Sequence, residues 1–230
     1  MMKKIADGKT KTLYALDDNR VVMVFKDDVT GTESGVDPGG NQVVGQVEGK
    51  GRAALRQSAY FFRLLASHGI PTHFVSVDLD KGILVARRAK WYGLEFIVRF
   101  KAYGSFVRRY GRYVQEGADL GTLVEITLKD DERGDPLIVD EALDAIGIMP
   151  LEKVREGKEL VKKAAGLIRE NLAAKGLELL DMKFECGLVD DRLVIIDDIS
   201  TDNMRVMRDG RGLSPQELLD TLGSQRVDGV

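Results

Sequence analysis

The 230-residue chain is poor in the residues that build cross-links and metal clusters, with one cysteine, two histidines and five prolines. A single cysteine, Cys186, excludes an internal disulfide and a zinc site made of several cysteines, and its apolar surroundings predict a small buried side chain. Long apolar runs are also absent: no stretch approaches the length of a membrane span, and Met1-Met2-Lys3-Lys4 is not followed by a signal-peptide core. These absences predict a cytoplasmic protein without a membrane partner.

An excess of one charge is missing as well. The chain carries 34 Lys and Arg against 37 Asp and Glu, a net charge of −3, which gives no support to binding of nucleic acid or of an acidic membrane surface. A hydrophobic content of 43% with 31% charged residues is ordinary for a folded protein. The length allows one sizeable domain or two small lobes around a cleft.

The stretch from Leu180 to Arg205 carries the clearest pattern. Its first residues alternate between apolar and charged side chains, so an extended strand would gather the charged ones on one face: Asp181, Lys183 and Glu185. A second apolar run, Leu193 to Ile196, follows a polar turn and ends in Asp197 and Asp198. The stretch therefore predicts a β-hairpin with acids at its open end.

The length of the hairpin turn decides which residues face each other. A two-residue turn at Asp190-Asp191 places Glu185 opposite Ile196, whereas a longer turn, or a bulge near Gly187, places Glu185 opposite Asp197. We predict the second arrangement, because two carboxylates and a lysine on one face suit a magnesium-nucleotide site. The alternative is an exposed strand face with a self-neutralising charge ladder.

The N-terminal third offers two further candidate segments. Lys9 and Lys11 follow Gly8 on one face of an extended segment, where they could lie over phosphates; lysines that protect a solvated strand edge are the alternative. The glycine-rich stretch from Gly31 to Gly45 predicts a mobile functional loop. A helix is expected from about Gly49 to a stop at Gly69, and a longer one over residues 151–175 that ends at Gly176.

A strand ending in Arg99 and a Gly104-Ser105 turn suggest an anion site. The planar fork of an arginine can grip a carboxylate or phosphate, and a Gly-Ser turn can offer backbone and hydroxyl donors to the same anion. The alternative is an ordinary strand in which Arg99 pairs with Glu95 or another acid. Lys129 follows a separate alternating strand, Val124 to Leu128.

Taken together, LLDMKFECG, DDISTDNMR and the set Glu95, Val98, Arg99, Gly104 and Ser105 resemble the motifs of the SAICAR synthetase (phosphoribosylaminoimidazole-succinocarboxamide synthase) family. The resemblance extends from Gly8 to about Arg205. It implies a two-lobed, kinase-like α+β fold of antiparallel sheets with flanking helices and a cleft between the lobes. Residues 1–85 would form a lobe that covers the nucleotide, and residues 86–230 a lobe that binds substrate and metal.

The resemblance also implies a reaction and a set of site residues. ATP and Mg²⁺ would serve an amide ligase of de novo purine biosynthesis that joins the carboxylate of carboxyaminoimidazole ribonucleotide to L-aspartate through an acyl phosphate. The small molecules would be the partners, and the protein a homo-oligomer. Glu185 and Asp197 would hold the metal, and Lys9, Lys11 and Lys129 the ATP phosphates. The ribonucleotide would contact Arg99, Ser105, Lys183 and Arg205, and the residues assigned to catalysis are Lys183, Arg205 and Asp181, the last as a support for Lys183.

The chain departs from the family pattern where a substrate would lie. Asp198 replaces a glutamate, Thr201 a proline, and Tyr103 an alanine. These departures leave open a paralogous ligase for another carboxylated heterocycle or amine, and a non-catalytic nucleotide-binding module is a further alternative. A protein-kinase activity is disfavoured, because the chain has no His-Arg-Asp or Asp-Phe-Gly motif.

Overall fold

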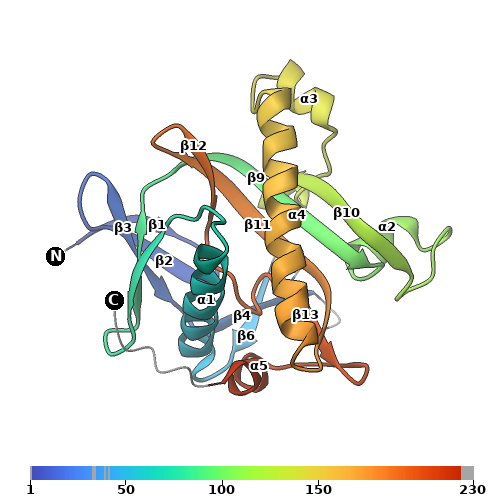
Figure 1. Ribbon diagram of the computed structural model, residues 1–230, viewed down its shortest axis with the longest axis horizontal. Coiled ribbons are helices and arrows are strands. Elements are labelled where there is room, and N and C mark those ends of the chain that lie inside the picture. Colours follow the sequence, from blue (N-terminus) through green and yellow to red (C-terminus); the bar gives the residue numbers. More distant parts are fainter. Residues whose placement is uncertain (1, 33–34, 39, 41, 224–230) are drawn as a thin grey trace.

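The computed structural model of the protein describes residues 2–32, 35–38, 40 and 42–223. These residues form antiparallel sheets flanked by helices, which confirms the predicted α+β class (Figure 1). The first sheet has the strand order β1-β2-β3-β8-β7, with β1 Lys3–Asp7, β2 Lys11–Ala15, β3 Arg20–Phe25, β7 Phe74–Asp78 and β8 Ile83–Arg87. The predicted division after residue 85 falls within β8 and stays a prediction.

The second sheet forms the centre of the molecule. It has the order β10-β9-β11-β13-β14, with β12 also paired to β11. Its strands are β9 Lys90–Lys101, β10 Asp119–Leu128, β11 Glu178–Val189, β12 Arg192–Ile196, β13 Met204–Arg208 and β14 Arg211–Gly212. A third, small sheet has the order β5-β4-β6, with β4 Asp28–Thr32, β5 Gly35–Val36 and β6 Gln42–Gln46.

This third sheet corrects the prediction of a mobile loop over residues 31–45. Valine and threonine are frequent around the glycines, and β-branched residues favour extended backbone. The glycines themselves allow close backbone approach: a Cβ added to Gly40 would lie 2.1 Å from the carbonyl oxygen of Gly31. Glycine content therefore marks tight packing of these segments here. Residues 33, 34, 39 and 41 of this stretch lie outside the described residues.

The helices are α1 Lys50–Ser67, α2 Ser105–Tyr110, α3 Asp140–Ala145, α4 Leu151–Ala173 and α5 Pro215–Leu222, with a short 3₁₀ turn at Asp131–Arg133. The two long ones, α1 and α4, pack against the sheets. In Figure 1, α4 crosses β9 and β11, and α1 stands against the first sheet. The two long helices confirm the expectations from sequence, and Gly176 follows α4 with a φ of 71°, as its stop requires.

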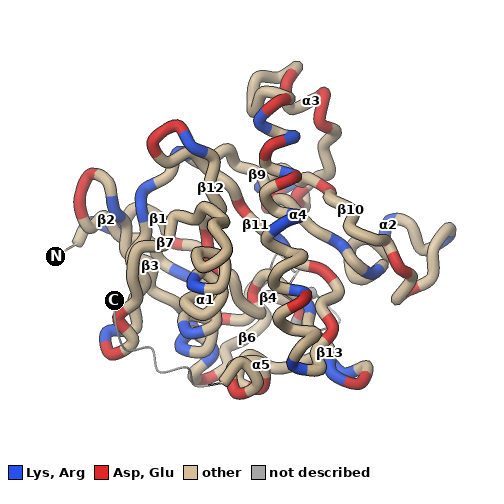
Figure 2. The backbone as a smooth tube through the Cα atoms, viewed as in Figure 1, with Lys and Arg blue, Asp and Glu red and all other residues tan. Residues whose placement is uncertain are grey.

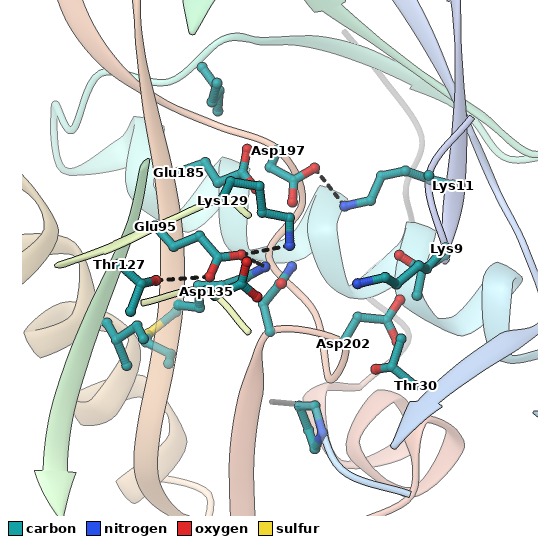
Figure 3. Close-up of a pocket in the computed structure, with 18 of the residues that line it drawn as sticks. Lys9, Lys11, Thr30, Glu95, Thr127, Lys129, Asp135, Glu185, Asp197 and Asp202 are labelled. Carbon is teal, nitrogen blue, oxygen red and sulfur yellow. Dashed lines mark hydrogen bonds and ion pairs between the residues drawn. The ribbon is translucent and has the colours of Figure 1, made fainter. Parts of the chain in front are cut away.

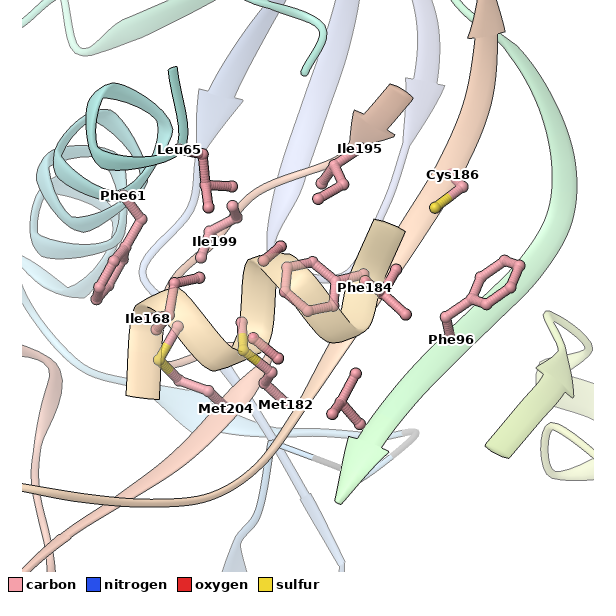
Figure 4. Packing of buried hydrophobic residues seen from close by; sticks show 14 of the residues in the cluster. Phe61, Leu65, Phe96, Ile168, Met182, Phe184, Cys186, Ile195, Ile199 and Met204 are labelled. Atoms are coloured by element: carbon pink, nitrogen blue, oxygen red, sulfur yellow. The ribbon is translucent and has the colours of Figure 1, made fainter. Parts of the chain in front are cut away.

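One apolar core joins the helices to the central sheet. Phe61 and Leu65 of α1, Ile168 of α4 and Phe184 of β11 are all buried, and they pack in one continuous cluster (Figure 4). Cys186 is fully buried in the same cluster, as predicted. Among the described residues, no helix is both long enough and apolar enough to cross a membrane.

The pairing of β11 positions the functional residues. One edge of β11 pairs with β9 along most of its length, while the other edge is shared: β13 pairs with Glu178 to Met182 and β12 with Glu185 to Val189. The segment between these two partners, residues 197–203, therefore leaves the sheet beside the middle of β11. The backbone N–H of Lys183 donates to the carbonyl of Asn203 at 2.8 Å, which fixes this segment there.

Candidate active site

A cavity of about 870 Å³ lies where the first and third sheets face the central sheet. The structure brings all the site residues predicted from sequence to the lining of this one cavity: Lys9, Lys11, Arg99, Ser105, Lys129, Asp181, Lys183, Glu185, Asp197 and Arg205. They come from β1–β2, β9–α2, the end of β10, β11, the segment after β12, and β13. Positive and negative residues are interspersed along the backbone (Figure 2), and residues of both signs line the cavity.

The predicted hairpin register was wrong. Val189 pairs with Arg192, which leaves a two-residue turn, and Glu185 pairs with Ile196 rather than with Asp197. Both turn residues adopt left-handed backbone, with φ of 50° at Asp190 and 59° at Asp191. Two left-handed residues give the turn twist that favours two-residue hairpins, and aspartate tolerates this conformation better than most residues.

Asp197 nevertheless reaches Glu185 by another route. Its own φ of 67° turns the chain out of β12, and its carboxylate lies beside that of Glu185 in the cavity (Figure 3). His73 holds this conformation, since its Nε2–H donates to the Asp197 carbonyl at 2.9 Å. Burial lowers the pKa of His73 to about 4, so the imidazole is neutral at neutral pH.

Asp197 disfavours the charged form of the neighbouring Glu185. Burial, together with the neighbouring Asp197, raises the pKa of Glu185 to about 8. No cluster of three or more His, Cys, Asp or Glu side chains suited to a metal occurs in the described ranges. Mg²⁺ needs no such cluster, because it is commonly held by one or two carboxylates with phosphate oxygens and waters. The donor set at Glu185 and Asp197 fits that ion.

The two lysines of the first sheet are paired across the cavity. Lys11 Nζ lies 2.5 Å from Asp197 Oδ1 and also contacts Asp198, while Lys9 Nζ lies 2.8 Å from Asp131 Oδ1. Burial alone would lower the pKa of Lys11, but the two aspartates outweigh it and raise the pKa. The Lys11 ammonium is therefore charged, and the ion pairs hold both lysine side chains over the cavity.

Lys129 and Lys183 share one buried carboxylate. Their Nζ atoms lie 2.9 Å and 2.8 Å from Glu95 Oε1, and Thr127 Oγ1 donates to Glu95 Oε2 at 3.1 Å. Burial would raise the pKa of Glu95, but the lysines lower it to about 2. Burial would likewise lower the pKa of Lys183, and Glu95, Glu185 and Asp197 raise it instead. Lys183 is thus a fixed cation between the proposed metal ligands and Glu95.

The arginines form a second network. The Arg99 side chain is 1% exposed, and it donates to Glu125 at 2.5 Å, to Asp181 at 2.9 Å and to Ser105 Oγ at 2.8 Å. The structure therefore has Arg99 paired with acids, the arrangement left open by the sequence. Asp181 also accepts two hydrogen bonds from Arg205 Nη1, at 2.9 and 2.7 Å. It therefore supports the two arginines and not Lys183, the residue that it was predicted to support, because Lys183 bonds to Glu95.

Several residues of the site were not predicted. Glu95 was recognised only as part of a motif, and it is the carboxylate that places two lysines. Asp37, from the stretch expected to be a loop, contacts Arg205, and Asp202 pairs with the buried Lys50 at 2.5 Å. Burial, with the charge of Asp198, raises the pKa of Asp202 to about 6. The only sequence signal for these partners was the presence of acids in motifs.

Comparison with known proteins places this arrangement in a family. A sequence model of SAICAR synthetase matches residues 4–220. The chain is 44% identical to a phosphoribosylaminoimidazole-succinocarboxamide synthase of Clostridium tetani, covering 94% of this chain and 97% of that protein. It is 37% identical to the enzyme of the same name from Caldivirga maquilingensis, over 93% of this chain and 86% of the relative.

Solved structures agree with the sequence relatives. A SAICAR synthetase in complex with ADP superimposes with a TM-score of 0.83 at 30% identity, covering 94% of this chain and 93% of that one. The SAICAR synthetase of Pyrococcus horikoshii gives a TM-score of 0.80 at 31% identity, over 92% of this chain and 93% of the other. The chain belongs to the SAICAR synthetase family.

Proposed function

We propose that this protein is an ATP-dependent carbon–nitrogen ligase of purine biosynthesis, which joins the carboxylate of carboxyaminoimidazole ribonucleotide to the amine of L-aspartate. The observation that carries the proposal is that all the residues carried over from the family motifs line one cavity. The relatives reported above give no support to a paralogue with a different carboxylate or amine.

The reaction has two balanced steps. A carboxylate oxygen of the ribonucleotide attacks the γ-phosphorus of ATP, so that a P–O bond forms to the carboxylate and ADP leaves. The aspartate nitrogen then attacks the acyl carbon, inorganic phosphate leaves, and the nitrogen loses a proton. Because several anions meet in the first step, positioned cations are the main contribution that a protein can make, and no nucleophilic side chain is required.

The metal would be held by Glu185 and Asp197. Two adjacent half-buried carboxylates, one with a raised pKa, form a site that a divalent cation would stabilise. Mg²⁺ supplies neutralisation of the phosphate oxygens and of the charge that develops during phosphoryl transfer. His73 contributes by fixing the backbone of Asp197.

The other cations divide between the two substrates. Lys9, Lys11 and Lys129 would contact the ATP phosphates, which would replace the carboxylates that pair with these lysines in the structure. Ser105, Lys183 and Arg205 would contact the ribonucleotide. Arg99 donates three of its N–H groups to described residues of the protein, one each from Nε, Nη1 and Nη2. Each terminal nitrogen has a second N–H, which would contact the ribonucleotide.

The test is ADP formation by the purified protein with ATP, Mg²⁺, the carboxylated ribonucleotide and L-aspartate, with each component omitted in turn. Turnover that requires all four supports the proposed ligase. A folded protein that binds Mg-ATP but forms no ADP with these substrates would overturn it. We further propose a cytoplasmic homo-oligomer; sedimentation velocity tests the oligomer.

A further inference from the structure

The guanidinium of Arg205 is enclosed by four groups. Asp181 accepts two of its hydrogen bonds, and Asp37, directly after β5, contacts its Nη2. The ring of Tyr103 lies with its centroid 5.9 Å from Arg205 Cζ. Gly104 closes the last side: a Cβ added there would lie 2.6 Å from Arg205 Nη2, so the guanidinium rests directly on this backbone.

Tyr103 is half-buried near Glu116, which lies in the turn between α2 and β10. Burial together with that carboxylate raises the pKa of the Tyr103 phenol. The next residues contact the second arginine of the cavity in a similar manner. The ring centroid of Phe106 lies 5.7 Å from Arg99 Cζ, and Ser105 Oγ accepts a hydrogen bond from Arg99. The segment 103–106 therefore fixes both arginines by ring contacts and short backbone approach.

We infer that Tyr103 is a positioning residue for the ribonucleotide, acting through Arg205. An arginine side chain loses considerable rotamer entropy when a ligand fixes it. An aromatic ring that already attracts the guanidinium restricts the side chain before the ribonucleotide binds, so less entropy is lost on binding. The ring and Gly104 hold the guanidinium plane while Asp181 and Asp37 satisfy some of its donors. This inference rests on the proposed function, in which Arg205 contacts the ribonucleotide.

A purely structural role for Tyr103 predicts something different. Loss of packing would lower the melting temperature and disturb the affinities for both substrates alike. A positioning role predicts a selective effect, because the lysines proposed for ATP belong to other segments, β1–β2 and the end of β10. The ratio of the two KM values separates these roles.

The experiment compares Tyr103→Phe, Tyr103→Leu and Tyr103→Ala in steady-state assays. Phenylalanine keeps the ring, so KM for the ribonucleotide should stay within about twofold, whereas the leucine and alanine variants should raise it by about threefold to tenfold, the range expected for loss of a cation–π contact. KM for ATP should stay within about twofold in all three. Equal changes in both KM values, or no change in the leucine variant, would overturn the inference.

Tyr113→Ala is the matched control. Arg112 Cζ lies 6.0 Å from the Tyr113 ring, a similar arginine-tyrosine contact, but both residues lie outside the cavity lining and Tyr113 is 82% exposed. This variant should leave every kinetic constant unchanged.

A second readout separates the inference from the proposed function. In ¹⁵N-labelled protein without ATP, the Arg205 guanidinium signal, assigned with Arg205→Lys, should be shifted by the Tyr103 ring and should report binding of ribose 5-phosphate. If the wild type forms no ADP, the proposed function fails, yet Tyr103→Leu must still weaken ribose 5-phosphate binding by about threefold or more. Unchanged binding in that variant refutes the inference alone.

Discussion

The carboxylates of Glu185 and Asp197 lie side by side in the cavity although the hairpin pairs Glu185 with Ile196. The left-handed backbone of Asp197, held by His73, produces this meeting after the strand has ended. The segment of residues 197–203 also carries Asp198, so the proposed metal ligand and the second acid that contacts Lys11 lie on one short stretch of chain.

Glu185→Gln should abolish turnover while the fold is kept. The substitution removes one carboxylate of the proposed metal pair, and we expect kcat to fall by about a hundredfold or more. The melting temperature should stay or rise, because desolvation and the neighbouring Asp197 disfavour the charged form of Glu185. Steady-state kinetics and thermal unfolding check both parts. Glu178→Gln is the control, because Glu178 lies on the same strand with a side chain that is 59% exposed, and it should retain full activity. If Glu185→Gln also retains activity, the metal assignment is refuted.

Glu95→Gln should reduce stability at neutral pH and lose that effect in acid. The folded pKa of Glu95, about 2, is below its ordinary value of 4.5, because Lys183 and Lys129 favour its charged form more than burial disfavours it. The carboxylate therefore contributes stability that is present above pH 4.5 and is lost as the pH falls toward 2. Removing it takes the shared buried carboxylate from two lysines, and Lys129 keeps only the longer contact with Asp131 at 3.7 Å, so we expect about 3 kcal/mol of destabilisation at pH 7.

Urea unfolding of the wild type and of Glu95→Gln at pH 7, 5 and 3 measures this difference. It should be similar at pH 7 and 5 and smaller at pH 3. A difference that grows in acid would contradict the assigned direction. Glu132→Gln, at an exposed position in the 3₁₀ turn, serves as the comparison and should show no such dependence.

Sequence reasoning succeeded where a repeating pattern decided the structure. The alternation over residues 180–185 predicted both the strand and the face that lines the cavity, and the 151–175 pattern predicted α4. It failed at the hairpin turn, because Asp190 and Asp191 fit more than one turn length and only the backbone conformation decides between them.

Partners remote in sequence were out of reach for a different reason. Glu125 meets Arg99 only because β10 pairs with β9, and His73 meets Asp197 only because the chain before β7 lies against β12. The spacing of residues within a single segment of the sequence therefore predicts neither contact. The glycines of residues 31–45 were misread because the packing of Gly31 on Gly40 is likewise a tertiary contact.

Gly104→Ala should impair the ribonucleotide site specifically. The residue has a φ of 53°, and the added Cβ would lie 2.6 Å from Arg205 Nη2, so the arginine must move. We expect kcat/KM for the ribonucleotide to fall by about tenfold or more, together with about 1 to 3 kcal/mol of lost stability from backbone strain. Gly121→Ala separates the two effects, because Gly121 has a φ of 66° and no atom within 4 Å of the added Cβ. It should lose stability and keep its kinetics; equal kinetic losses in both variants would refute the prediction.

Asp131→Asn should tighten ATP binding. Asp131 neutralises Lys9 across the cavity at 2.8 Å, and it lies 3.7 Å from Lys129 as well. If both lysines bind phosphates, the aspartate competes with ATP for them, and removing its charge should lower KM for ATP by about twofold to fivefold, the range for a partly exposed ion pair. KM for the ribonucleotide should not change, because the groups proposed to bind it lie on other segments.

Glu132→Gln is the matched control for this change as well. It removes one negative charge from the same turn at a position that does not line the cavity, so it tests whether the effect is local or comes from net charge. KM for ATP should be unchanged in the control. A rise in KM for ATP in Asp131→Asn would mean that Asp131 itself contacts the nucleotide. The role of Lys9 would then be tested by Lys9→Met, which should raise KM for ATP if Lys9 binds phosphate. If neither variant changes KM for ATP, the two residues form only a contact between sheets, and the assignment of Lys9 to the phosphates is wrong.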